Sequence, residues 1–529
     1  MLPSLHWLDY LTLGGYILAM VVIGAAFYRK ESSVSEYFVA SRQMPTIVVV
    51  MGVSAALLSG ISYLGTPSYA YRVNLIPFAT ILGMPIALLI LSHVLLPFFF
   101  KLEVVTVYEY LERRFNPSIR LLSSILFLIS RMAWLALLTY GPALVLKVAT
   151  PIPVPSWGLK TCDMLGLDPQ IAIWVLVVGT TCTFYTVLGG MRAVMWTDAA
   201  QFVLLFGGLV VALGYAISQV DGGAIQAWRI AHEAGRTRIL DFSFSWTDGT
   251  FWAAMIGGIF LWLGDMGTDQ LTVQRYLSAK SLRHSQQGVF FQMLLQPPVL
   301  LLLYGVGLAL FAYYQQHPDS MVQNILNKSP DALLPLFYLQ HMIPGLTGLM
   351  LAAILAATMS SLTAGINSLS AATVVDLYRR HLAPAASPEQ SVRIGRFTTI
   401  AWGLQITLLA LYVGRLGQGL MEMSYTFMGL TATLSIGIFL TAIFLPQVNT
   451  RSLWIGLAAG TVMTIIAVSN GIHWLWYYPI GAASLFVVAG VTGVFSEAPP
   501  LHSISGLTYW TRHQPLLPLQ ETFEIAPKS

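Results

Sequence analysis

Apolar runs long enough to cross a lipid bilayer recur along almost the whole chain. A membrane-spanning helix needs about 20 consecutive apolar residues, and we count thirteen such runs between Trp7 and Phe495. Only 9% of the 529 residues are charged, whereas soluble globular proteins carry roughly 25%. The chain is therefore predicted to be an all-α polytopic membrane protein. The predicted spans are residues 7–28, 46–71, 75–100, 120–148, 170–189, 193–217, 250–276, 286–314, 347–374, 394–414, 418–445, 453–470 and 475–495.

The basic residues predict how these spans are oriented. Short cytoplasmic loops collect Lys and Arg, and every second loop between the predicted spans is rich in them. With an odd number of spans, this pattern predicts an N-terminus outside and a cytoplasmic C-terminus, in the plasma membrane or, in a bacterium, the inner membrane. The basic residues of the predicted cytoplasmic loops are Arg29, Lys30, Arg42, Lys101, Arg113, Arg114, Arg120, Arg192, Arg275, Lys280, Arg283, Arg379, Arg380, Arg393, Arg396 and Arg451.

Two predicted spans contain interruptions that are unfavourable in a membrane helix. The stretch AALLSGISYLGTP, residues 55–67, carries Ser, Gly and Pro, and GGIFLWLGDMGTDQ, residues 257–270, places Asp265 and Asp269 among glycines. Hydrocarbon tolerates such breaks only where protein or a water-filled cavity satisfies the freed backbone groups. Acids within a span are functional candidates by default. For the first stretch, close helix packing through small residues is the alternative.

The two interruptions fall at matching places if the spans form two sets of five. These sets are residues 45–217 and 250–445. Paired discontinuous helices at matching positions indicate an inverted-repeat transporter with a binding site near the membrane midplane. The remaining parts are then a first helix and loop (1–44), an extracellular loop (218–249), two C-terminal helices (446–498) and a cytoplasmic tail (499–529) that we expect to be loosely ordered.

A third candidate site is LAAILAATMSSLTAG, residues 351–365 in the ninth predicted span. Helical spacing puts the carbonyl of Ala357 beside the side chains of Ser360 and Ser361. Such a group of neutral oxygens suits a hard cation such as Na⁺. The alternative is that the hydroxyls bond back to the preceding turn of their own helix.

The sequence does not indicate an enzyme. No loop between the spans is long enough to hold a separate catalytic domain. We find no nucleophile with its base, no His/Cys spacing for a metal and no phosphate-binding loop. We therefore expect a transport protein.

Five separated motifs follow one another along the chain: EYFVASRQMP, TVYEYLERRFN, GGMRAVMWTDAAQF, GTDQLTVQRYLSAKS and TMSSLTAGINSLSAATVVDLYRR. In this order they resemble the sodium/solute symporter family, which includes sodium-coupled glucose, proline, iodide, monocarboxylate, multivitamin and sialic acid transporters. The resemblance covers about residues 7 to 450. It implies a LeuT-type fold of two inverted five-helix repeats with flanking helices, and import of a solute by the inward Na⁺ gradient.

The resemblance also implies the sodium ligands. The site shared by the family takes backbone carbonyls that match Ala55 and Leu58 in the broken second span and Ala357 in the ninth. The hydroxyls that complete this site match Ser360 and Ser361.

A second sodium would use other residues. Members with two sodium ions place an acid in the sixth span and two more hydroxyls in the ninth, and Asp198 and Thr363 match this pattern. Ala364, however, stands where such members often have Ser or Thr. Asp198 and Thr363 are thus expected at a second sodium site or on the exit path of the first ion. The structural alternative for Asp198 is an acid at the membrane edge beside Arg192 and Trp196.

Arg131 is the candidate for recognising the solute. It lies eleven residues beyond Arg120, about 16 Å into the span at helical rise, where an arginine needs a partner or a cavity. It resembles the arginine with which sialic acid transporters clamp a carboxylate, a task suited to a guanidinium fork. The alternative is a salt bridge to Asp265 or Asp269.

Other residues are expected to complete the solute pocket. Ser59 and Ser62 follow the break in the second span, and Asp265 lies at the break in the seventh. Trp262, one turn before Asp265, is expected to form a wall.

These features predict a Na⁺-coupled secondary active importer that works by alternating access on a small organic anion. Sialic acid, a monocarboxylate and a sugar acid are the candidate solutes. The alternative is a neutral sugar or polyol, with Arg131 structural. A solute-gated channel or a sensor is a third class, although the chain has no attached signalling domain. The expected partners are the solute, Na⁺ and the lipid bilayer, with no nucleic acid and no obligatory protein partner.

Overall fold

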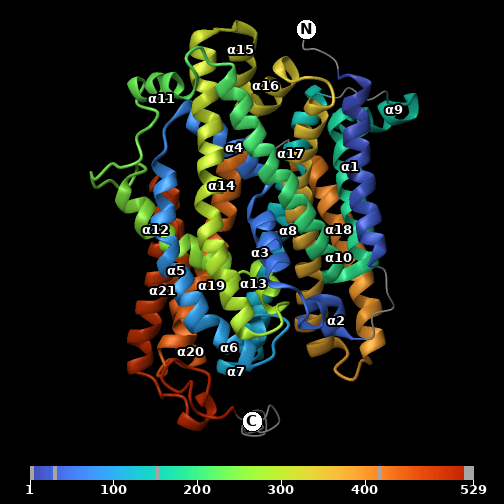
Figure 1. The fold of residues 1–529 in the computed structure, drawn as a ribbon. Coiled ribbons are helices and arrows are strands. Elements are labelled where there is room, and N and C mark those ends of the chain that lie inside the picture. Colours follow the sequence, from blue (N-terminus) through green and yellow to red (C-terminus); the bar gives the residue numbers. More distant parts are fainter. Residues whose placement is uncertain (1–4, 28–32, 150–153, 414–419, 517–529) are drawn as a thin grey trace.

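The chain folds into a bundle of helices. A computed structural model describes residues 5–27, 33–149, 154–413 and 420–516, and the only strand-like pairing within these ranges is one bridge between Met44 and Ala279. Figure 1 shows the first turn of α1 (Trp7–Ala26) at one end of the bundle and residues 501–516 at the other. The chain therefore crosses the bundle an odd number of times.

Ten helices in the described residues are long and apolar enough to span a membrane, or up to eleven if α3 (Thr46–Leu57) and α4 (Gly60–Arg72) are one bent span. The sequence predicts thirteen spans, and each predicted range overlaps a helix. The numbers differ because α10 (Pro169–Ser218) is counted once although it holds two predicted spans. In addition, α19 (Leu420–Phe444) counts only as a short apolar helix over Thr431–Phe444.

Gly190 divides α10 into two helices. Its backbone has φ 49° and ψ −145°, a conformation that residues with a Cβ rarely adopt. A Cβ at this position would also lie 2.7 Å from the carbonyl oxygen of Tyr37 in α2 (Val34–Val39). Glycine is therefore required both for the turn and for the close approach of α2.

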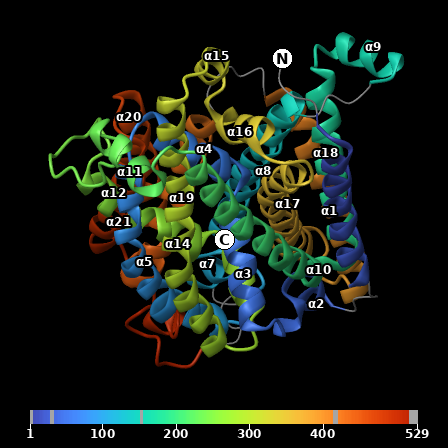
Figure 2. The same ribbon diagram turned by 45° about the horizontal axis from the view of Figure 1, so that its top comes forward.

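α17 (Leu346–Ala372) is the central helix. Of the most apolar part of its span, 94% is buried inside the protein, against 28% for α1. Its sequence is rich in Ala, Ser, Thr and Gly on every side, and such small residues let neighbouring membrane helices approach closely. Figure 2 shows α17 surrounded by α1, α10, α18 (Pro388–Val413) and α8 (Pro117–Ala149), all of which contact it. Any site on α17 is thus enclosed by other helices.

The remaining elements complete the bundle and its ends. Of these, η3, η4 and η6 are π-helical and the other η elements are 3₁₀ helices. In chain order they are η1 (Ala40–Arg42), η2 (Ile76–Leu82), α5 (Met84–Ile90), η3 (Leu91–Leu95), α6 (Leu96–Lys101), α7 (Tyr108–Arg114), α9 (Ser156–Leu165), α11 (Gly223–Glu233), α12 (Phe251–Leu263), η4 (Gly264–Thr268), α13 (Gln270–Leu277), α14 (Leu282–Gln316), α15 (Ser320–Lys328), η5 (Pro330–Ala332), α16 (Leu333–His341), η6 (Thr373–Leu382), α20 (Thr450–Ser469), η8 (Trp474–Trp476), α21 (Tyr477–Val494) and η9 (Leu501–Ile504).

The start of the C-terminal tail is more ordered than the sequence predicts. The hydroxyl of Tyr110 donates to the carbonyl of Leu507 at 2.8 Å, and the indole of Trp510 donates to the carbonyl of Phe444 at 2.9 Å. Lys101 donates to the carbonyl of Gln514 at 2.8 Å. The expectation of a loosely ordered tail is therefore wrong for residues 501–516, and residues 517–529 lie outside the described part.

Candidate functional site

The break between α3 and α4 creates two helix ends inside the bundle. α3 ends at Leu57, α4 begins at Gly60, and their axes differ by 60°. The hydroxyl of Ser59 caps α4 by accepting a hydrogen bond from the backbone N–H of Ser62 at 3.2 Å. A Cβ at Gly60 would lie 2.2 Å from Oγ1 of Thr358 in α17. The glycine thus lets the start of α4 approach the central helix.

The last carbonyls of α3 meet the two serines of α17. Oγ of Ser360 lies 2.9 Å from the carbonyl oxygen of Ala55 and 3.2 Å from that of Ala357. Oγ of Ser361 lies 2.9 Å from the carbonyl oxygen of Ala56 and 3.3 Å from that of Ala357. Both serines are fully buried.

This oxygen cluster has the chemistry of a site for a hard monovalent cation. The C-terminal end of a helix carries a partial negative charge, and here it is supplied by the last carbonyls of α3, which face the serine hydroxyls of α17. Four of the five predicted sodium ligands, Ala55, Ala357, Ser360 and Ser361, are joined by these short contacts, and Leu58 lies in the break beside them. Ala56 was missed by the sequence analysis, since no spacing rule tells which carbonyls of the last turn face α17.

The seventh predicted span is also broken. α12 ends at Leu263, the wide π-turn η4 follows, and α13 begins at Gln270. Asp269 caps α13, its carboxylate accepting a hydrogen bond from the backbone N–H of Leu271 at 3.3 Å. π-Turns within α-helices are frequent at functional sites. The two acids noted in the sequence therefore lie at a real interruption of the helix.

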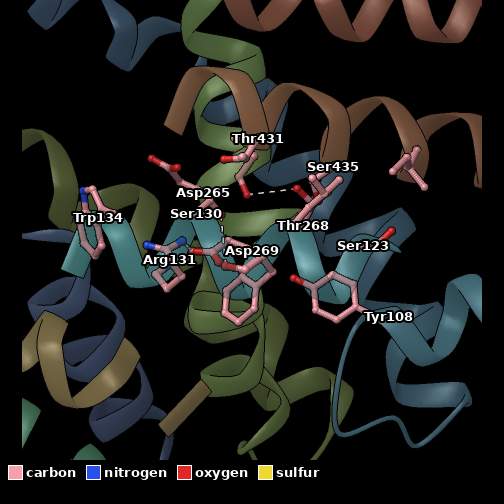
Figure 3. Close-up of a pocket in the computed structure, with 15 residues that line it drawn as sticks. Tyr108, Ser123, Ser130, Arg131, Trp134, Asp265, Thr268, Asp269, Thr431 and Ser435 are labelled. Atoms are coloured by element: carbon pink, nitrogen blue, oxygen red, sulfur yellow. Dashed lines mark hydrogen bonds and ion pairs between the residues drawn. The ribbon is translucent and has the colours of Figure 1, made fainter. Parts of the chain in front are cut away.

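Arg131 of α8 forms an ion pair with Asp269. Its guanidinium also lies over the indole ring of Trp134, 4.8 Å from the ring centre. Figure 3 shows Arg131 directed toward Asp269, while the carboxylate of Asp265 stands apart from this pair. The salt bridge that the sequence left open as an alternative is thus present at Asp269 and absent, among the described residues, at Asp265.

Three cavities meet at Asp265, and two of them are also lined by the Arg131–Asp269 ion pair. The central cavity is lined by four of the five predicted solute residues, Ser59, Ser62, Arg131 and Asp265. The narrow cavity shares Arg131, Trp134, Asp265 and Asp269 with it and continues to Tyr108 and Ser123. The Arg131–Asp269 pair therefore lies where these two cavities join.

The wide cavity adjoins the central cavity on its other side. They share Ser62 and Asp265, and the wide cavity extends to Arg72, at the end of α4, and to Trp474. Figure 1 shows α4 in the half of the bundle where α1 begins, and Arg72 is the last residue of α4. Trp262, the fifth predicted solute residue, lines the wide cavity instead of the central one, because its indole donates to the carbonyl of Thr80 at 3.0 Å.

The helices are tied together by buried ion pairs beyond the narrow cavity. Arg120 of α8 lies 2.6 Å from a carboxylate oxygen of Glu112 in α7 and 2.7 Å from one of Asp376 in η6. Arg380 pairs with the other carboxylate oxygen of Glu112 at 2.7 Å. From the sequence, Arg120 and Arg380 indicate only the orientation of the loops. Glu112 lies 8 residues before Arg120, but Asp376 lies 256 residues beyond it, so no local signal could have identified that pair.

Asp198 is fully buried and forms an ion pair with Arg275 at 2.7 Å. From the sequence, the alternative for Asp198 is an acid at the membrane edge beside Arg192 and Trp196. In the structure its ion-pair partner is Arg275, and the guanidinium of Arg192 donates to the side chain of Gln43. The hydroxyl of Thr363 donates to the carbonyl of Met359 in its own helix at 2.9 Å. The structure thus gives both residues protein partners, and Arg275 is a further residue that the sequence analysis missed as a partner.

The chain matches the sodium:solute symporter family over residues 37–460. It is 30% identical to the sodium/sialic acid symporter NanT of Aliivibrio fischeri, covering 92% of this chain and 93% of the relative. It is 28% identical to the sodium/sialic acid symporter SiaT of Proteus mirabilis, covering 94% and 98%, and 30% identical to the human sodium/iodide cotransporter, covering 82% and 65%.

Solved structures agree with these matches. A substrate-bound, outward-open Na⁺-coupled sialic acid symporter superposes with a TM-score of 0.82 at 28% identity, covering 94% of this chain and all of that one. Mhp1, a transporter of the nucleobase-cation-symport-1 family, superposes with a TM-score of 0.53 at 12% identity, covering 92% and 97%. The predicted LeuT-type fold is confirmed.

Proposed function

Because this chain belongs to the sodium:solute symporter family, we propose that it imports a small organic anion that carries a carboxylate, together with Na⁺, by alternating access. We propose that it performs no chemistry on the solute and needs no obligatory protein partner. The observation that carries the proposal is the position of Arg131 in the wall of the central cavity, next to the break that contributes carbonyls to the oxygen cluster on α17.

Arg131 supports recognition of a carboxylate even though it is paired with Asp269. A guanidinium has five N–H donors in a planar fork, and the ion pair uses one nitrogen, Nη2. Donors therefore remain for a carboxylate that enters the central cavity. Arginine binds carboxylates in a two-pronged geometry that lysine cannot reproduce. Stacking on Trp134 leaves the edge of the guanidinium, where these donors lie, available to the solute.

The relatives support an anionic solute. NanT and SiaT are named for sialic acid, and other relatives are named for iodide and for monocarboxylates. All of these are anions. Among the candidates, sialic acid is therefore the first to test, followed by sugar acids and monocarboxylates.

The ion and the solute are proposed to be coupled through the broken second span. The carbonyl of Ala56 accepts a hydrogen bond from Ser361 on α17, while Ala56, Leu57 and Ser59 line the central cavity. A cation in the oxygen cluster would hold the end of α3 against α17 and so fix the shape of the solute site. Binding of one would then favour binding of the other, and thermodynamic linkage makes this effect reciprocal.

We assign the sodium ion to Ala55, Leu58, Ala357, Ser360 and Ser361 and propose a single ion per cycle. A second ion at Asp198 and Thr363 would have to compete with the buried Arg275, and Ala364 supplies no hydroxyl. Asp198 is better suited to the exit path. One Na⁺ with a monoanion moves no net charge, so a tenfold Na⁺ gradient supplies about 1.4 kcal/mol and concentrates the solute about tenfold.

We propose that the N-terminus lies outside and the C-terminus in the cytoplasm, with repeats at residues 45–217 and 250–445. In Figure 1, α2, α6 and α7, which border predicted basic loops, lie at the same end as residues 501–516. The wide cavity then opens outward, and the Arg120 ion pairs close the cytoplasmic side.

A neutral sugar or polyol is the second candidate solute. The pairing of Arg131 with Asp269 favours it, because a guanidinium neutralised by a resident acid has less need of an anion. In that case Arg131 would hold α8 against α13 and make no direct contact with the solute.

Uptake into proteoliposomes tests the proposal. Labelled N-acetylneuraminate, gluconate, pyruvate, glucose and inositol are supplied under an inward Na⁺ gradient, with K⁺ as the control. We expect Na⁺-dependent accumulation of at least one acid. This accumulation should be lost in Arg131→Ala and also in the double variant Arg131→Ala/Asp269→Asn, in which Asp269 is not left as an unpaired charge. Accumulation of a neutral solute by the double variant would establish the second candidate instead.

A further inference from the structure

The carboxylate of Asp265 lines all three cavities and has no hydrogen bond or ion pair to any residue in the described ranges. Asp269, four residues later, lines two of these cavities as well, but it pairs with Arg131 and caps α13. Two acids at the same break thus have opposite roles. Asp269 is satisfied by the protein, whereas Asp265 takes its hydrogen bonds from whatever occupies the cavity.

The protein holds Asp265 in this position. A Cβ at Gly264 would lie 2.9 Å from the side chain of Ile436 in α19, and a Cβ at Gly267 would lie 2.7 Å from that of Leu95 in η3. The π-turn that carries Asp265 is therefore fixed between two neighbouring elements. The backbone that carries the carboxylate is thus held beside the cavities.

A second polar group in the central cavity also lacks a partner. Thr272 of α13 lines this cavity, is 1% exposed, and its hydroxyl makes no hydrogen bond within the described residues. Buried hydroxyls are nearly always hydrogen-bonded, and an exception requires an explanation such as an absent ligand. Asp265 and Thr272 together therefore indicate a ligand with several hydrogen-bonding groups.

We infer that Asp265 selects carboxylates that also carry hydroxyl groups, with Thr272 as a second contact. The inference rests on the proposed function, in which Arg131 binds the carboxylate of the same solute. When a solute displaces water from the cavity, Asp265 must receive donors from that solute or lose its hydrogen bonds. A hydroxylated acid supplies such donors, and its bonds to a carboxylate are short and strong. An alkyl acid supplies no such donors, so Asp265 would lose its hydrogen bonds without replacement.

This makes Asp265 a specificity residue for sugar acids over plain monocarboxylates. Sites built to hydrogen-bond a substrate hydroxyl reject an analogue without it by large factors, because the buried groups of the site are left unpaired. The preference for hydroxylated acids should depend on Asp265, whereas the affinity for any carboxylate should depend on Arg131.

The test compares acids that differ in their hydroxyl groups. Gluconate and hexanoate have the same six-carbon chain and carboxylate, and only gluconate carries hydroxyls; N-acetylneuraminate is a larger hydroxylated acid. Dissociation constants are measured by titration calorimetry with the purified full-length protein in Na⁺ and in K⁺. The variants are Asp265→Ala, the milder Thr272→Val, and Asp163→Ala as a matched control, since Asp163 is an exposed acid on α9.

With Na⁺, we expect one hydroxylated acid to bind at least about 100-fold more tightly than hexanoate. Asp265→Ala should reduce this preference to about tenfold or less while leaving hexanoate binding unchanged or tighter. Thr272→Val should reduce the preference by a smaller factor, and Asp163→Ala should not change it. If Asp265→Ala fails to fold, the inference is tested by whether Thr272→Val reduces the preference for the hydroxylated acid over hexanoate.

Two results would overturn the inference alone: hexanoate that binds as tightly as the hydroxylated acids, or a preference that survives both Asp265→Ala and Thr272→Val. If no acid binds in a Na⁺-dependent way, the proposed function itself fails, and this inference fails with it. The two failures are thus distinguished by whether any carboxylate binds.

Discussion

Removing the hydroxyl of Ser360 should weaken sodium binding without disturbing the fold. Oγ of Ser360 lies 2.9 Å from the carbonyl oxygen of Ala55 and 3.2 Å from that of Ala357, so it joins the broken span to the central helix. Ser360→Ala deletes one of the five proposed oxygen ligands and keeps Cβ, so the packing of α17 is retained. A hydrogen-bonding group that faces a charge contributes roughly 1.5–3 kcal/mol. Since 1.4 kcal/mol corresponds to tenfold, the Na⁺ dissociation constant should rise roughly 10- to 100-fold.

The measurement does not require the solute to be known. An ion that binds only the folded protein stabilises it by RT ln(1 + c/Kd), where c is the Na⁺ concentration, so the unfolding temperature rises with Na⁺ concentration once that concentration exceeds Kd. Thermal unfolding of the purified protein is therefore followed over a range of Na⁺ concentrations at constant total salt, with K⁺ as the replacement ion. The curve for Ser360→Ala should shift to higher Na⁺.

Ser368→Ala is the matched control. Ser368 lies two turns further along α17, is equally buried, and its hydroxyl donates only to the carbonyl of Gly365 at 2.9 Å. This substitution should leave the Na⁺ dependence unchanged. Identical Na⁺ curves for Ser360→Ala and the unmodified protein would refute the assignment of the oxygen cluster as the sodium site.

Three further substitutions test other parts of the structure. Arg131→Lys keeps the charge opposite Asp269 but loses the planar fork. Calorimetry should therefore show a carboxylate bound roughly 10- to 100-fold more weakly, a loss of about 1.4–2.8 kcal/mol in binding free energy. Unchanged affinity would make Arg131 structural. Gly60→Ala places Cβ 2.2 Å from Oγ1 of Thr358 and should destabilise the fold by about 1–3 kcal/mol. The double variant Gly60→Ala/Thr358→Ala should recover the unfolding temperature. If it does not, this clash is not the cause of the destabilisation. Arg275→Ala leaves the carboxylate of Asp198 buried and unpaired and should lower the free energy of unfolding by about 3–5 kcal/mol. The double variant Arg275→Met/Asp198→Asn should be more stable than Arg275→Ala alone. Equal unfolding temperatures for these two variants would contradict a stabilising ion pair.

The membrane fold, the family and the positions of the two breaks could be predicted from the sequence because each depends on local properties. A span is a run of apolar residues, and a break is a cluster of Gly, Ser and Asp within it. Ser360 and Ser361 could be singled out for the same reason, since helical spacing alone sets them beside the carbonyl of Ala357. Family motifs then connected these local features to a LeuT-type symporter, which the comparisons confirm.

The partners of the charged residues could not be predicted in this way. Arg131 pairs with Asp269 across 138 residues of sequence, and Asp198 pairs with Arg275 across 77. The sequence offered Asp265 and Asp269 as equal partners for Arg131, and it placed Trp262 in the same pocket as Arg131. The rotation of each helix against its neighbours decides these points. It sets that Asp269 is paired while Asp265 faces the cavities, and that the indole of Trp262 lines the wide cavity.

The amino-acid sequence by itself therefore determined where helices form, where they break and which oxygen atoms share one turn, because these properties act over a few residues. Only the tertiary structure decided which groups satisfy one another within the protein and which remain for a ligand. In a membrane interior a polar group must find a partner. Asp265 and Thr272 are two groups of the central cavity to which the surrounding helices, as described, provide no partner.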